Sequence, residues 1–172
     1  MMIALAGLTT ASAQSKGDMA VGVQFGVAPC LETGGPTNMG IGAKFQYNVT
    51  DPIRLEADVD YWFKASGCDL FDISANFQYL FKVSDKFLVY PVVGVGYASL
   101  GGTAVLEGYD RYNNLVNEVV TGSASVSRVI ANVGVGAEYA VSSKISVGAE
   151  IKYQYVKDFQ RLPINIGVTY KF

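Results

Sequence analysis

Hydrophobic residues alternate with polar or small ones along most of the chain. In segment 53–63, Leu55 and Val59 fall on one face, and Glu56 and Asp58 fall on the other. This period of two predicts β-strands, and helical periodicity is nearly absent. We expect eight strands of about 9–11 residues, the length that a tilted strand needs to cross a bilayer, at 19–27, 39–48, 53–63, 71–81, 87–97, 129–139, 145–155 and 162–172.

The predicted connections alternate between short and long. Short turns rich in Asp, Ser, Asn or Pro are expected at 48–52, 82–86 and 140–144, and longer loops at 28–38, 64–70, 98–128 and 156–161. In the longest loop, 103–109 and 115–123 keep the alternation around a turn-like 110–114. This pattern predicts that strands five and six project from the sheet as a hairpin. A variable loop without a partner is the alternative.

The two faces of the predicted sheet differ sharply. Pro91 is the one position of the first face that is not hydrophobic, whereas charged residues and glycines share the second face. A soluble barrel would turn the apolar face inward. The apolar face, however, has aromatic residues at both strand ends, as at two lipid–water boundaries, and glycines in a narrow lumen make room for long side chains. With no run of 18 apolar residues for a membrane helix, we predict an all-β, eight-stranded, antiparallel up-and-down transmembrane β-barrel.

The second face would line the lumen of this barrel. Its charges predict an internal network of salt bridges, because buried charges persist when they are paired. An ion path lined by the same residues is the main alternative, and acid–base chemistry by Asp58 and Asp60 is a weaker one. The residues are Lys44, Arg54, Glu56, Asp58, Asp60, Asp72, Arg128, Glu138, Glu150, Lys152 and Lys171.

The composition of the chain excludes several kinds of catalytic and metal site. The chain has no histidine, which removes Ser-His-Asp and Cys-His catalysis and histidine-ligated metals. Its net charge of −2 offers no general attraction to nucleic acid. Cys30 and Cys68 fall in loops on the same side, so they form a candidate disulfide, with two unpaired thiols as the alternative. We expect no enzyme activity, cofactor or metal site.

The first 13 residues are apolar and then small, and Ala11-Ser12-Ala13 before Gln14 is typical of a signal-peptidase site. We therefore expect a signal peptide at 1–13, whose positively charged beginning is missing, and a barrel domain at 14–172. A hydrophobic N-terminal strand is the alternative.

The last strand carries a resemblance to a known family. Its Asn165, Gly167, Tyr170 and Phe172 resemble the C-terminal signal of bacterial outer-membrane barrels. With eight strands, the chain resembles small barrels of the OmpA/OmpX type. The resemblance implies a Gram-negative outer membrane with both termini periplasmic, insertion by the barrel-assembly machinery, and contact with lipid and lipopolysaccharide.

Two functions remain open for such a barrel. The first is a non-enzymatic membrane anchor whose extracellular loops interact with surfaces or other cells. An extracellular protein partner would bind the 98–128 loop through Tyr109, Arg111 and Tyr112, because tyrosine and arginine favour interfaces. The second is a small passive channel for ions or solutes.

Overall fold

The computed structural model describes residues 15–32, 35–65, 68–109, 115–157 and 159–172, with side chains described except at 68, 102–124 and 159. Among these residues there is no helix of the length and hydropathy that a membrane crossing requires. The strands are β1 (Met19–Pro29), β2 (Thr37–Asn48), β3 (Ile53–Ala65), β4 (Cys68–Tyr79), β5 (Phe81–Lys82), β6 (Phe87–Tyr109), β7 (Leu115–Ala140), β8 (Ile145–Val156), β9 (Phe159–Arg161) and β10 (Ile164–Lys171).

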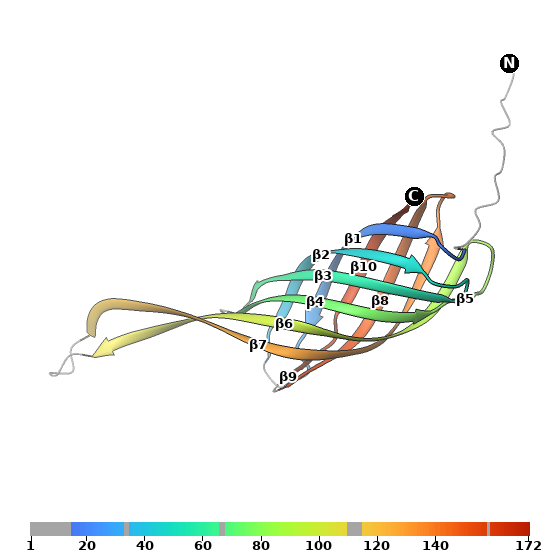
Figure 1. Ribbon diagram of the computed structural model, residues 1–172. Coiled ribbons are helices and arrows are strands. Elements are labelled where there is room, and N and C mark those ends of the chain that lie inside the picture. The colour runs from blue at the N-terminus through green and yellow to red at the C-terminus, as the bar shows by residue number, and fades with distance from the viewer. Residues whose placement is uncertain (1–14, 33–34, 66–67, 110–114, 158) are drawn as a thin grey trace, which may run out of the picture.

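These strands close into one antiparallel barrel (Figure 1). Each strand pairs with its neighbour in sequence, and β10 pairs with both β8 and β1, which leaves no open edge in the barrel wall. β5 continues β4 in the same register against β6, and β9 continues β10 against β8. The ten segments are therefore the eight strands of the predicted barrel. Because the barrel is closed, the backbone N–H and C=O groups of every strand find partners on both sides within the barrel wall.

The register fixes which side chains point into the lumen. Odd positions face outward from β1 to β8, as in Val23 and Val93, which are 66% and 51% exposed. In β10 the outward positions are even, because Val23 pairs with Val168. This shift of parity confirms the pattern of the sequence. It leaves an exterior of exposed aliphatic and aromatic residues and an interior of buried polar ones.

Strands β6 and β7 extend well beyond the other strands as a two-stranded hairpin (Figure 1). Their ladder continues without a break from Phe87↔Tyr139 to Glu107↔Val119, and a register shift follows before Tyr109↔Leu115. The predicted projecting hairpin is confirmed. We call this side of the barrel the hairpin end. The opposite side, which has the turns 49–52 and 141–144 and the C-terminus, is the short-turn end.

Two of the predicted long loops are short. The expected loop 64–70 is wrong, since β3 runs to Ala65 and β4 starts at Cys68. The expected loop 156–161 is likewise reduced, because β8 ends at Val156 and β9 starts at Phe159. The alternation fades in these segments, but the backbone ladders continue. A register shift between Trp62 and Ala65 takes up the irregularity.

Candidate functional site

The middle of the lumen is an ion-pair network on three strands, β2, β3 and β8. Lys152 of β8 reaches across to β3 and contacts Asp58 at 2.7 Å, and it also contacts Glu150 of its own strand at 3.3 Å. Lys44 of β2 lies 3.4 Å from Glu56 of β3. All of these side chains are buried to at least nine-tenths. The pair of Lys152 with Asp58 joins strands that are not neighbours, so it ties β8 to β3 across the interior of the barrel.

A second group lies nearer the short-turn end and centres on Arg54 of β3. Its guanidinium contacts Glu138 of β7 at 2.8 Å and donates through Nε to Gln78 Oε1 at 2.5 Å. Its carbon Cζ lies 4.7 Å from the centre of the Tyr90 ring. Arg54 is fully buried, and the stacked ring supplies a cation–π contact in addition to the ion pair.

This stack depends on a glycine. Gly136 is the register partner of Tyr90, and a Cβ placed there would lie 2.5 Å from the ring carbon Cε2 and 2.6 Å from the hydroxyl. We expect Gly136→Val to displace the Tyr90 ring and destabilise the barrel by about 1–3 kcal/mol, the usual cost of overpacking. Urea unfolding in lipid vesicles measures the change. Gly148→Ala is the control, because its nearest contact would be 3.2 Å, and an equal loss in both variants would contradict the role of Tyr90.

A third group lies at the hairpin end. Asp72 of β4 accepts a hydrogen bond from Trp62 Nε1 at 2.8 Å and pairs with Arg161 of β9 at 2.6 Å. The Arg161 guanidinium also stacks over the Trp62 ring at 4.9 Å and donates to Gln154. The sequence offered Arg161 only as part of a loop. The sequence does contain a signal for Arg161. Even positions face inward up to Val156, but the inward positions of the last strand are odd. The odd-numbered Arg161 therefore points into the lumen.

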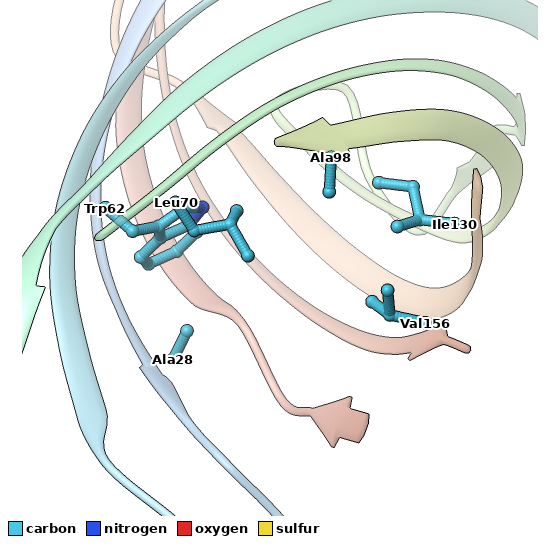
Figure 2. Close-up of a cluster of buried hydrophobic side chains, with 6 residues drawn as sticks. All are labelled: Ala28, Trp62, Leu70, Ala98, Ile130 and Val156. Atoms are coloured by element: carbon cyan, nitrogen blue, oxygen red, sulfur yellow. The ribbon is translucent and has the colours of Figure 1, made fainter. Parts of the chain in front are cut away.

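Apolar layers enclose this polar interior. At the hairpin end, buried side chains from six strands point into the barrel (Figure 2), namely Ala28, Trp62, Leu70, Ala98, Ile130 and Val156, with Leu100 packed against them. At the short-turn end a smaller cluster consists of Leu80, Leu88, Tyr90 and Val92. The layer at the hairpin end is built from six strands, whereas the cluster at the short-turn end lies along one side of the wall, on β6 and next to β4.

Of the remaining predicted lumen residues, Lys171 and Arg128 lie apart from the buried network, whereas Asp60 is buried within it. Lys171 is at the short-turn rim and pairs with Asp18 at 3.2 Å. Arg128 is half-buried at the hairpin end, where its Nη1 donates to the Ser127 carbonyl oxygen. Asp60 is 4% exposed and accepts a hydrogen bond of 2.7 Å from Gln24. The charges of the lumen thus lie at three levels along the barrel, and Arg161 contributes the buried cation at the hairpin end.

The candidate loop residues fall largely outside the described part of the chain. Arg111 and Tyr112 lie there entirely, and so does the side chain of Tyr109. Cys30 is half-buried beside Arg161 on the neighbouring strand, and it forms no disulfide among the described side chains. The side chain of Cys68 is outside the described part, so the disulfide stays a prediction.

The four residues of the C-terminal signal divide between the two faces of β10. Asn165 and Gly167 point into the lumen, and Tyr170 and Phe172 are 44% and 63% exposed on the outside. Lys144 lies over the Tyr170 ring at 5.6 Å. A lipid-facing aromatic pair at the end of the chain suits the boundary between hydrocarbon and water. Their part in assembly stays a prediction.

The comparisons with known proteins follow this geometry. The family described as "Outer membrane protein beta-barrel domain" matches residues 1–172. No curated protein matches the chain in sequence. Among solved structures, the attachment invasion locus protein Ail of Yersinia pestis is 15% identical with a TM-score of 0.64, covering 91% of this chain and 99% of Ail.

Two other solved structures have the same architecture. Neisserial surface protein A is 17% identical with a TM-score of 0.66, covering 90% of this chain and 96% of that protein. The N-terminal barrel domain of Pseudomonas aeruginosa OprF is 18% identical with a TM-score of 0.58, covering 92% and 100%. At these identities the likeness concerns the fold.

Proposed function

Because the chain belongs to the outer membrane protein beta-barrel domain family, we propose that its barrel is a non-enzymatic anchor in the outer membrane that presents the β6–β7 hairpin for binding to other surfaces. The single observation that carries this proposal is the hairpin itself. Its strands have 23 and 26 residues, about twice the 12 residues of β4 or β8. That length exceeds what a membrane crossing needs.

The hairpin offers two sheet edges beyond the barrel. Among the described residues, β4 pairs with β6 no further than Gly102, and β8 pairs with β7 no further than Ile130. The residues beyond these points pair only with each other. Unpaired backbone donors and acceptors on such edges accept an added strand. This supports contact with an extracellular protein.

The filled lumen favours an anchor over a channel. The ion pairs of Arg54, Lys152 and Arg161 cross the interior, and the apolar layer at the hairpin end spans six strands. A conducting pore needs a continuous wet path. Conductance would therefore require the central pairs to separate and the apolar layers to open.

The orientation and the chemistry belong to the same proposal. The short-turn end, with both chain ends, faces the periplasm, and the hairpin end faces outward, where lipopolysaccharide surrounds it. The barrel-assembly machinery inserts the chain through its last strand.

Asp58 and Asp60 serve structure and not catalysis, since Asp58 is held by Lys152 and Asn76. Ail has been solved with the heparin analogue sucrose octasulfate, which makes heparin a useful first probe here.

The decisive experiment shortens the hairpin without touching the barrel. Gly102 and Ala124 are register partners, so residues 103–123 are replaced by Asn-Gly, which closes a two-residue turn. We expect bacteria displaying the wild-type barrel to adhere to epithelial cells or immobilised heparin, and the shortened variant to fall to the level of cells without the protein.

Folding is checked by the shift of gel mobility on heating, which must be the same in both proteins. Equal adherence of the shortened variant would contradict the role of the hairpin. Single-channel steps from the refolded wild type in a planar bilayer would favour the passive channel instead.

A further inference from the structure

Among the residues whose side chains are described, the lumen holds more buried negative charge than positive charge. Six buried carboxylates face four buried cations there, a difference of two; the members are Glu56, Asp58, Asp60, Asp72, Glu138 and Glu150 against Lys44, Arg54, Lys152 and Arg161. The pair of Asp18 with Lys171 at the rim is neutral. Excess charge in a buried space is strongly unfavourable unless it is compensated.

One unit of this excess lies where three carboxylates meet. Asp58, Asp60 and Asp72 each offer one oxygen, and these oxygens lie within 4.8 Å of one another. Lys152 contacts Oδ2 of Asp58, and Arg161 contacts Oδ2 of Asp72. Asp60 has an amide donor, Gln24, and among the described residues no cation within ion-pair distance. Three carboxylates and two cations therefore leave a local deficit of positive charge.

An independent observation points to a missing partner at this place. Gln24 of β1 is 5% exposed, and its amide lies against Asp60, to which Nε2 donates at 2.7 Å. The Oε1 atom of the same amide is buried and has no hydrogen-bond partner, and neither does Oδ1 of Asp58. Buried polar atoms are nearly always satisfied. Both atoms belong to side chains of this cluster and lack a hydrogen-bond donor. Amide and carboxylate oxygens are the ligands that a hard cation prefers.

We propose that Asp58, Asp60 and Asp72, together with the Gln24 amide oxygen, hold one divalent cation inside the barrel. Two units of positive charge would balance the excess of two carboxylates in the described lumen as a whole, one of which lies at this cluster. Calcium fits better than magnesium, because Ca–O distances of about 2.3–2.6 Å allow two ligand oxygens to lie about 5 Å apart, whereas Mg–O distances of about 2.0–2.1 Å do not. The cation is structural, because the apolar layer that contains Trp62 and Leu70 covers it from the hairpin end.

The structure provides its own spectroscopic probe. Trp62 is the one tryptophan of the chain, and its indole nitrogen lies 2.8 Å from Asp72. Terbium, which takes calcium sites, bound between the three carboxylates would be excited by energy transfer from this ring. Because the site is enclosed, the ion is added while the full chain refolds into detergent, and unbound ion is removed by gel filtration.

We expect one terbium or calcium ion per refolded barrel by elemental analysis, with terbium emission on tryptophan excitation that calcium, when present during refolding, suppresses. Asp60→Asn should reduce bound ion at least tenfold. Asp85→Asn, at an exposed turn, should leave it unchanged. Trp62→Phe should abolish the sensitised emission while the bound ion remains. Gln24→Met should raise the terbium concentration for half-saturation by roughly 10–100-fold, the range seen when a supporting ligand is lost.

Two outcomes would overturn the proposal. The first is a heat-modifiable, folded wild-type barrel that retains no ion after refolding with calcium or terbium, because protons would then neutralise the carboxylates. The second is equal ion content in the Asp60→Asn, Gln24→Met and wild-type barrels, because the ion would then lie elsewhere. If Asp60→Asn fails to fold, the ion content of Gln24→Met tests the proposal, because replacing the neutral Gln24 amide removes no charge. Neither result depends on adhesion through the hairpin.

Discussion

Replacing Lys152 with methionine is expected to destabilise the barrel by about 3–5 kcal/mol, the cost of orphaning a buried charge. Lys152 is 2% exposed and is the shared cation of Asp58 at 2.7 Å and Glu150 at 3.3 Å. Methionine preserves the approximate length of the side chain but leaves both carboxylates without their shared positive charge. The midpoint of urea unfolding in lipid vesicles, followed by tryptophan fluorescence and gel mobility, measures the loss.

The controls separate charge from shape. Lys86→Met lies on an exposed turn and should change stability by less than about 0.5 kcal/mol. Adding Asp58→Asn to Lys152→Met should recover part of the loss, because one of the two orphaned charges disappears. If Lys152→Met unfolds at the same urea concentration as the wild type, the central pairs do not hold the barrel together.

Lysine at the middle of the lipid-facing surface should be the next most damaging change. Val93 points outward, is 51% exposed and lies between the outward aromatics Phe87 and Tyr97 of β6. We expect Val93→Lys to cost about 2–4 kcal/mol, because a cation at the bilayer midplane loses its hydration. Unfolding in vesicles again provides the measurement.

The matched control is Val83→Lys, at a valine of similar exposure, 63%, on the turn between β5 and β6. At that depth lysine should cost no more than about 1 kcal/mol. If both substitutions cost the same, the apolar surface around Val93 does not face hydrocarbon.

The barrel was predictable from sequence because its signal is repeated in every strand. Alternation in segments such as 53–63 fixed the inward and outward faces, and the change of parity in the last strand was visible at Ile164, Ile166 and Val168. Lipid demands an apolar exterior and a closed ladder. Few other folds satisfy both constraints with eight strands, so the architecture and the projecting hairpin follow from local pattern alone.

Pairing inside the lumen was not predictable. The sequence places charges at heights along the strands, but Lys152 and Asp58 belong to strands far apart in the chain, and side-chain length decides which groups meet. The sequence does not identify Arg161 as a lumen residue, because the polar residues around it, including Lys157 and Gln160, resemble a surface loop. The end of alternation near Lys64 likewise predicts the end of a strand, whereas backbone hydrogen bonding continues regardless of side-chain type.

The unbroken ladder between β6 and β7 has a mechanical consequence. From the lipid-facing Tyr97 to Tyr109, strand geometry of about 3.4 Å per residue allows a reach of up to roughly 40 Å. A tethered loop of the same composition would sample a broad volume and would lose that freedom on contact. A ladder that continues directly from the wall holds its far pairs, such as Glu107 with Val119, at a set distance and direction from the barrel. A force applied to that end would load the backbone hydrogen bonds between β6 and β7 in shear.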